Sequence, residues 1–382
     1  MSTKSLIFGD KVLLVIVLLL SLFSFFPVFS SSSYLSYVID GASPIYYLVK
    51  HLIVILFGFI LMLSIKLVPF KFFRGMSIIL LPIGIGLLVY TLSKGTIIGG
   101  SAASRWIDIP FVGISFQTSA LAAIIIITYT ARYLSKVELS KTKFSETLIP
   151  LWLPIFTYIF LIFPANFSSA FLIFTALVIT LSISGFPLRH LFKVFLILGF
   201  LLITFFFTAK TFPDKFPNRI DTWLSRIENF GSNKNLDASY QIERAKMAIN
   251  NGGLIGVGAG KSIMKNHLPQ SNSDFIFAII VEEWGSIGGA FIICLYILMF
   301  FRFLSITHRI DDRFGKILVS GLGVFIIIQA FTNISVATQI IPVTGQNLPL
   351  ISSGGSSAWM TCISLGMILS VSSSIKNKNG KQ

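Results

Sequence analysis

The amino-acid sequence predicts an all-α, polytopic membrane protein, and three observations support this fold class. Hydrophobic residues make up 54% of the 382 residues and charged residues only 12%, with a mean hydropathy of +0.85, whereas soluble domains are about 25% charged. Apolar runs recur along the whole chain, many of them near the ~20 residues that a helix needs to cross a bilayer. Lysine and arginine gather in alternate connections, which is the asymmetry that orients membrane helices.

Ten apolar segments qualify as membrane-spanning helices. The first follows Lys4 and Lys11 and is longer than the ~7–15-residue core of a signal peptide, so we expect an uncleaved span; a cleaved signal peptide is the alternative. Several segments contain Pro or Gly, which membrane helices tolerate. The predicted spans are 11–30, 46–67, 76–93, 116–135, 148–164, 167–186, 189–209, 274–303, 316–340 and 350–374.

The basic residues predict the orientation of these helices. They are dense in the connections 66–74, 132–143 and 302–316 and near both chain ends. The short connections on the opposite side hold only Lys50, Lys94 and Arg105. Both termini are therefore predicted to be cytoplasmic. The net charge of +15 fits contact with anionic lipids better than binding of nucleic acid.

The chain is expected to form a single transmembrane domain, 1–382, with one large external loop, 210–273. Within it, residues 217–230 place apolar residues at i, i+3, i+4 and i+7, which predicts a helix either in the membrane interface or packed on the protein. Residues 239–250 predict a second short helix. The following glycines end in Lys261-Ser262 like a nucleotide-binding loop, but the required spacing fails. Their backbone N–H groups could still approach a phosphate.

Three carboxylates, Asp274, Glu282 and Glu283, fall at the start of the eighth predicted span. Acidic residues at membrane depth are costly and usually functional. The topology places Asp274 at the outer mouth of the helix and Glu282 about 12 Å deeper. An N-cap is the alternative role for Asp274. The two glutamates are adjacent and cannot share a helix face, and we expect them to support the site.

These residues lie in blocks that resemble the SEDS family of RodA- and FtsW-type proteins (shape, elongation, division and sporulation). The match extends over nearly the whole chain, and the family also has ten helices with both ends cytoplasmic. The resembling blocks are Tyr240-Gln241, Gly252-Gly253-Leu254, Leu268-Pro269, Ser273-Asp274-Phe275-Ile276-Phe277-Ala278, Glu282-Glu283, Ser104-Arg105-Trp106-Ile107, Phe116-Gln117-Thr118-Ser119 and 342–357 (PVTGQNLPLISSGGSS).

The resemblance implies a peptidoglycan glycosyltransferase that polymerises lipid II on the outer face of the bacterial cytoplasmic membrane. Asp274 would be the general base of an inverting reaction. Supporting roles are expected for Glu282, Glu283, Gln117 and Ser353. A divalent cation, Mg or Mn, could contribute, although the sequence shows no ligand cluster. The candidates for binding the lipid diphosphate are Arg105, Arg226, Arg244, Lys246, Lys261 and Lys265.

The turn 164–170 and the Gln117-Thr118-Ser119 variant favour the division-type (FtsW) branch over the RodA-type branch. The resemblance then implies action at the division septum with a class B penicillin-binding transpeptidase (FtsI-like) and other divisome membrane proteins. One departure is that Ala120 and Ala123 replace the family's usual Glu–Lys pair. Losing both charges together can be nearly neutral. The alternatives are a lipid II flippase and a non-catalytic scaffold for a transpeptidase.

Overall fold

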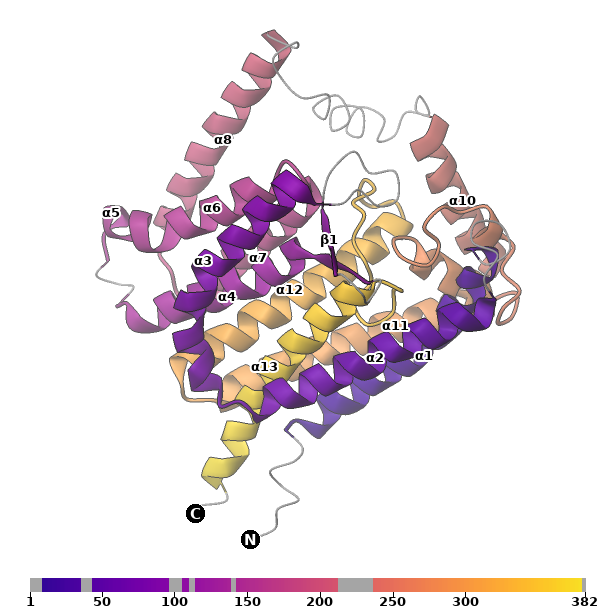
Figure 1. Cartoon of the computed structure of the whole chain (residues 1–382), viewed down its shortest axis with the longest axis horizontal. Helices are drawn as coiled ribbons and strands as arrows, with labels where there is room; N and C mark the ends of the chain where they lie inside the picture. Colours follow the sequence, from indigo (N-terminus) through magenta and orange to yellow (C-terminus); the bar gives the residue numbers. More distant parts are fainter. Residues whose placement is uncertain are drawn as a thin grey trace.

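The computed structural model describes residues 9–35, 43–95, 105–109, 114–138, 142–211 and 236–379. Its elements form a helical bundle with one small β-hairpin (Figure 1). They are α1 Lys11–Leu35, α2 Pro44–Leu67, α3 Phe70–Lys94, β1 Trp106–Ile109, β2 Ile114–Gln117, α4 Thr118–Lys136, α5 Phe144–Thr147, the π-helical stretch η3 Leu148–Trp152, α6 Leu153–Ile162, α7 Phe167–Ile183, α8 Leu188–Thr211, α10 Leu236–Gly252, the 3-10 turn η5 Met264–Asn266, α11 Ile276–Arg309, α12 Arg313–Ala337 and α13 Gly355–Asn379.

Each predicted apolar segment coincides with helical structure, and the protein is a multi-pass membrane protein. In the described part of the chain, eight helices are long and apolar enough to cross a membrane. The helix α7 is a shorter apolar helix of 17 residues, and α8 is not among the eight. The predicted count of ten crossings is therefore not confirmed. In the predicted external loop, α10 confirms the helix predicted over 239–250. Arg226 and the helix predicted over 217–230 lie outside the described residues.

An antiparallel hairpin precedes α4, and the all-α prediction omitted it. Trp106 pairs with Gln117 and Ile109 with Ile114. Its strands of four residues are rich in aromatic and β-branched side chains, which favour extended backbone. Strands this short give too few alternations to be recognised beside a long apolar run. The span predicted to begin at residue 116 consequently begins at Thr118.

Buried aromatic side chains tie the helices together through their polar tips. The hydroxyl of Tyr158 in α6 donates to the carbonyl of Leu81 in α3 at 2.7 Å. The indole nitrogen of Trp359 in α13 donates to the carbonyl of Val54 in α2 at 3.0 Å. Where water is absent, such a bond satisfies the tip while the ring fills the core. The helix α12 lies at the centre, packed against α4, α7, α11 and α13.

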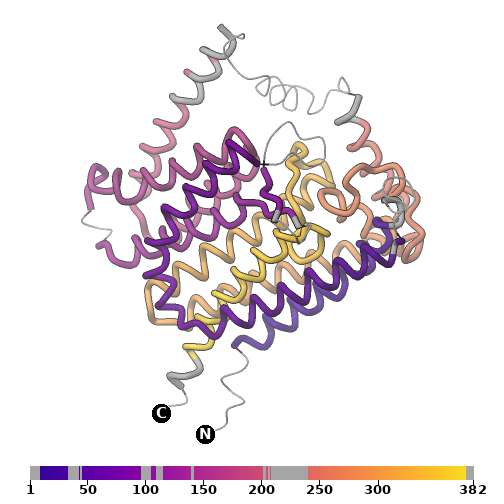
Figure 2. The backbone as a smooth tube through the Cα atoms, in the orientation of Figure 1, coloured from indigo at the N-terminus to yellow at the C-terminus, as the bar shows by residue number. Residues whose placement is uncertain are grey.

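The first and last helices show on which side of the bundle the two chain ends lie. Figure 2 shows the start of α1 and the last coloured turns of α13 at one end of the molecule, while the hairpin and α10 lie toward the other. This agrees with an even number of crossings. The cytoplasmic location of this end stays a prediction. The segment from α10 to α11 packs against α1 and α11, so the predicted external loop returns to the bundle beside the acidic residues.

Candidate active site

Asp274 lies in a turn just before α11. The helix begins at Ile276, and its N-cap is Phe275, whose side chain makes no capping hydrogen bond. The alternative role of Asp274 as the N-cap is therefore wrong. The side chain of Asp274 is nevertheless 9% exposed, so the carboxylate is held in the protein and not in bulk water. A buried acid that is not the N-cap residue of its helix needs another explanation.

The backbone around Asp274 is clamped by side chains from two distant segments. Three consecutive carbonyl oxygens each accept a hydrogen bond from a residue far away in sequence. Because buried carbonyls require partners, this clamp fixes the path of the backbone and thus the direction of the carboxylate. The carbonyl of Asn272 accepts from the backbone N–H of Ser353 at 3.0 Å and from the hydroxyl of Ser353 at 2.9 Å. The carbonyl of Ser273 accepts from the hydroxyl of Ser352 at 2.7 Å. The carbonyl of Asp274 accepts from Nδ2 of Asn333 at 2.9 Å.

Asn333 joins the Asp274 turn to the segment 342–350. Its Nδ2 also donates to the carbonyl of Gln346 at 2.7 Å. Two carbonyl acceptors on one nitrogen fix which end of the amide is NH₂. Gly345 lies in the same segment at φ +66°, and a Cβ added there would lie 3.5 Å from Oδ2 of Asp274. The segment is therefore joined to the Asp274 backbone through Asn333 and lies beside the Asp274 carboxylate at Gly345.

The helix α11 is broken at Gly285, which has φ 67° and ψ −175°. The glycine-rich loop after α10 fills the break. The carbonyls of Glu282 and Glu283 accept from the backbone N–H groups of Val257 at 2.9 Å and Gly258 at 3.0 Å. A Cβ at Gly256 would lie 2.3 Å from the carbonyl oxygen of Glu283, so this approach requires glycine. The predicted use of these glycine-loop N–H groups for a phosphate is therefore wrong for residues 257 and 258.

The two glutamates point to different partners, in agreement with their adjacent positions on a helix. Glu282 is fully buried and accepts from the hydroxyl of Ser262 and the N–H groups that follow it. Glu283 accepts from the hydroxyl of Ser30 in α1. Lys265 donates to Ser30 at 3.1 Å. The glutamates thus hold the loop against α11 and α1, and their supporting role in catalysis stays a prediction.

The basic residues predicted to bind diphosphate lie in different settings. The side chain of Lys265 also donates to the carbonyl of Gly260 at 2.7 Å, so it helps hold the loop. The guanidinium of Arg244 lies 4.8 Å from the ring centre of Tyr240. Nε of Arg105 donates to the carbonyl of Ala165 at 2.7 Å and tethers the hairpin to the α6–α7 turn. The side chains of Lys246 and Lys261 are exposed.

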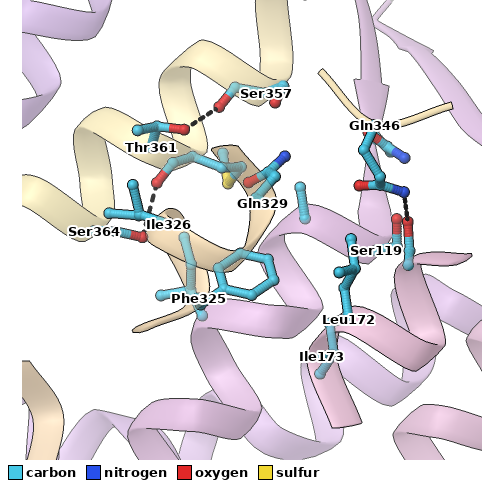
Figure 3. A pocket seen from close by; sticks show the side chains of 15 residues that line it. Ser119, Leu172, Ile173, Phe325, Ile326, Gln329, Gln346, Ser357, Thr361 and Ser364 are labelled. Atoms are coloured by element: carbon cyan, nitrogen blue, oxygen red, sulfur yellow. Dashed lines mark hydrogen bonds between the residues drawn. The ribbon is translucent and has the colours of Figure 1, made fainter. Parts of the chain in front are cut away.

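A small cavity of about 30 Å³ lies between α4, α7, α12 and α13, and we call it the bundle cavity. Ala120 lines it, at one of the two positions where the family's Glu–Lys pair is usual. Gln117, Gln329 and Gln346 also line it, and none of its lining residues is charged. Figure 3 shows Gln329 and Gln346 beside this space. Nε2 of Gln346 donates to the hydroxyl of Ser169 at 3.0 Å. The volume suits one or two water molecules, not a substrate.

A divalent cation has limited support from the donor groups. Among the described residues, no three His, Cys, Asp or Glu side chains come together to hold a metal ion. Mg²⁺ is commonly held by one or two carboxylates together with substrate phosphates. Asp274 is the carboxylate that would contact such an ion, and its presence stays a prediction.

Sequence reasoning missed Asn333 and gave Ser352 no role at the site. A lone asparagine inside the apolar span 316–340 was an available signal, because polar side chains at membrane depth usually bond to another helix. Ser352 lies beside Ser353 in the serine–glycine block, where helix packing was the expected use. The identity of their partners depends on the tertiary fold.

The chain matches known proteins over most of its length. The sequence profile of the FtsW/RodA/SpoVE family, described as cell cycle protein, matches residues 10–377. A probable peptidoglycan glycosyltransferase FtsW from Hydrogenovibrio crunogenus is 31% identical over 333 residues, covering 86% of this chain and 82% of the relative. Stage V sporulation protein E of Bacillus subtilis is 29% identical over 366 residues, covering 95% of this chain and 96% of the relative.

Solved structures share the fold. A chain of a peptidoglycan synthase complex that coordinates polymerization and crosslinking superimposes with a TM-score of 0.75 at 20% identity, covering 96% of this chain and 98% of that one. The crystal structure of the rod shape determining protein RodA from Thermus thermophilus gives a TM-score of 0.66 at 21% identity, covering 95% of this chain and 96% of that one. These likenesses confirm the predicted all-α membrane fold.

Proposed function

Because the chain belongs to the FtsW/RodA/SpoVE family, whose profile matches residues 10–377, we propose that it is a peptidoglycan glycosyltransferase that joins lipid II disaccharides into glycan strands. The FtsW relatives bear this activity in their names and cover most of the chain. The observation that carries the proposal is the clamped turn, which holds a carboxylate at a helix mouth by three consecutive backbone carbonyls.

In the proposed reaction, Asp274 is the general base. Its carboxylate removes the proton from the 4-hydroxyl of the incoming sugar, and that oxygen attacks the anomeric carbon of the growing glycan. The bond between this carbon and the lipid diphosphate breaks with inversion, and the diphosphate leaves with the electron pair. A positioned base typically contributes about 10²–10⁴-fold in rate. Positive charge from Arg105, Arg226, Arg244, Lys246 or Lys261 would stabilise the leaving group.

The cellular setting belongs to the same proposal. We place the reaction at the outer face of the cytoplasmic membrane, with both termini cytoplasmic, at the division septum. The partner is a class B transpeptidase, alongside other divisome membrane proteins. The names of the FtsW relatives support the division role, and the likeness to a chain of a synthase complex supports a partner that crosslinks.

The test is glycan polymerisation from purified lipid II, with and without the partner transpeptidase. Wild type is expected to make long glycan strands, and Asp274→Ala to make none while keeping its expression and its affinity for the partner. Asp312→Asn is the matched control, because Asp312 caps α12 through its side chain and Asn caps equally well. Normal polymerisation by Asp274→Ala would refute the base assignment.

One feature favours a second candidate, a lipid II flippase. The break of α11 at Gly285 resembles the discontinuous helices of transporters. A flippase moves lipid II between leaflets of a vesicle and leaves it as monomer. Translocation without polymer would support it, whereas the absence of both activities, with or without the partner, would favour a non-catalytic scaffold.

A further inference from the structure

Two polar contacts tie α1 to α11. The carboxylate of Asp10, just before α1, forms an ion pair with the guanidinium of Arg302 in α11. Toward the other end of α1, the hydroxyl of Ser30 donates to the carboxylate of Glu283 in α11. In both helices the spacing between the two contacts corresponds to about 30 Å at 1.5 Å per residue. This length matches the ~30 Å thickness of the hydrocarbon core of a bilayer.

The stretches between these two contacts have the composition expected inside a bilayer. Residues 12–29 of α1 and 284–301 of α11 contain no charged side chain. Charged side chains are costly in hydrocarbon and lie near headgroups and water. The two contacts therefore mark the two boundaries of the hydrocarbon core along α1 and α11. The boundary at Ser30 and Glu283 is the outer one, because it lies away from the end with both termini, which is predicted to be cytoplasmic.

The glycine loop, residues 252–260, lies at this outer boundary, because its backbone pairs with both sides of the break in α11. Besides the two bonds that it donates to the glutamate carbonyls, it accepts two from the far side of the break. The carbonyl of Gly253 accepts from the backbone N–H of Ser286 at 2.9 Å. The carbonyl of Leu254 accepts from the backbone N–H of Ile287 at 3.3 Å. An irregular segment beside hydrocarbon must pair its backbone groups within the protein, and these bonds to α11 meet that requirement.

The glycine loop exposes two large apolar side chains at the same boundary. Leu254 is 74% exposed and Ile255 is 81% exposed. The α11 surface after the break exposes Ile287 and Phe291, which lie one turn apart on one face of the helix. Exposed apolar side chains that occur together indicate contact with a partner or a membrane. The position of the loop at the edge of the hydrocarbon core favours the membrane, because acyl chains there remove this apolar surface from water.

We propose that Leu254 and Ile255 insert into the outer leaflet and anchor the glycine loop to the acyl chains of phospholipids. The hydrogen bonds between the loop and α11 then hold the outer segment of α11, and with it the Asp274 turn, at a fixed height above the bilayer. This second step rests on the proposed function, because a lipid-borne substrate presents its sugar at a height set by the membrane. Leu254 and Ile255 are thus positioning residues that do not touch the substrate.

The first experiment measures the membrane depth of the loop with nitroxide labels on the full chain in phosphatidylcholine nanodiscs. Cys294 and Cys362, the two cysteines of the chain, are replaced by alanine. A single cysteine is then introduced and labelled, by Leu254→Cys in one sample and by Ile255→Cys in a second. Collisions of the label with oxygen, which concentrates in hydrocarbon, are compared with collisions with a water-soluble nickel chelate.

Two reference positions define the outcomes. Ile83→Cys reports hydrocarbon, since Ile83 is exposed near the middle of α3, and Asn266→Cys reports an exposed polar position that follows the glycine loop. Labels at 254 and 255 are expected to favour oxygen, as the label at 83 does. Labels that favour the nickel chelate, as at 266, would overturn the insertion. Labels that neither reagent reaches would assign the surface to a protein partner or a second copy, and would overturn it as well.

The second experiment tests the positioning step by glycan synthesis in phosphatidylcholine liposomes. The double variant Leu254→Ser, Ile255→Ser is expected to lose activity several-fold, whereas Leu254→Met, Ile255→Met keeps the apolar surface and should retain it. Ile340→Ser is the matched control, since Ile340 is 70% exposed and lies outside the glycine loop. Full activity of the serine pair, or equal loss in the methionine pair, would refute positioning by lipid contact. Wild type that makes no glycan would refute the proposed function, while the label depths still decide the insertion.

Discussion

The bundle cavity differs in size, charge and relation to Asp274 from a second cavity, the hairpin cavity, which is lined by Lys50, Trp106 and Asn272 among others. The hairpin cavity has about 290 Å³ and carries Lys50 without a partner among the described residues. The bundle cavity has about 30 Å³ and only neutral lining residues. Charge is thus present at the helix mouth and absent from the bundle cavity at Ala120, where the family usually has an ion pair. In this chain a basic residue therefore lines the cavity that includes Asn272, whereas the bundle cavity holds no charged side chain.

Asn333 links the Asp274 turn to a residue of the bundle cavity, so its loss should have the largest effect. It holds the carbonyls of Asp274 and Gln346, and Gln346 lines the bundle cavity. Asn333→Leu leaves both carbonyls without this donor, at about 1–3 kcal/mol each. We expect unfolding in detergent to become easier by about 2–6 kcal/mol and polymerisation to fall at least tenfold. A variant with normal stability and rate would show that the clamp does not position Asp274.

A single charge placed in the bundle cavity should have the next largest effect. Ala120→Glu puts a carboxylate among neutral groups at membrane depth, at a cost of about 2.5–3.5 kcal/mol. The double variant Ala120→Glu, Ala123→Lys supplies a partner one helical turn away. We expect the melting temperature to drop for the single variant and to recover partly for the double variant. A single variant as stable as wild type would mean that the bundle cavity is more hydrated than its volume indicates.

A smaller effect is expected at Gly345, which lies beside the Asp274 carboxylate. Gly345→Ala imposes a left-handed conformation on a residue with a Cβ, at about 1–2 kcal/mol, and adds a methyl group 3.5 Å from Oδ2 of Asp274. We expect a several-fold loss of polymerisation at saturating lipid II, with little change in lipid II affinity. Gly185→Ala is the control, since Gly185 also has positive φ and no atom lies near its Cβ position. Equal loss of rate in both variants would assign the effect to strain.

The smallest effect is expected at Gln329, which lines the bundle cavity four residues before Asn333 in α12. Gln329→Leu also replaces an amide side chain by an apolar one, as Asn333→Leu does, but it removes no hydrogen-bond donor from the clamped carbonyls. We expect stability within about 0.5 kcal/mol of wild type, as for a site without special features, and unchanged polymerisation. A large loss of rate here would give the bundle cavity a role in catalysis and weaken the distinction between the two regions.

Sequence patterns were strong enough to predict the helices and the family. Long apolar runs need no partners to be recognised, because a spanning helix satisfies its own backbone hydrogen bonds. The sequence did not predict the hairpin, because each strand is stabilised by its partner strand and gives only a few alternating residues to recognise. The start of α11 was misplaced by two residues, from Asp274 to Ile276, since the turn that precedes it depends on Asn333 and Ser352.

The amino-acid sequence by itself determined the membrane class, the helical segments and the position of Asp274 at a helix mouth, because hydropathy and charge act locally along the chain. Only the tertiary structure decided that Asp274 is not a helix cap, that the glycine loop fills the break at Gly285, and that Lys50 and Asn272 line one cavity. These contacts join residues far apart in sequence. Their geometry follows from how the helices pack, and no local pattern contains it.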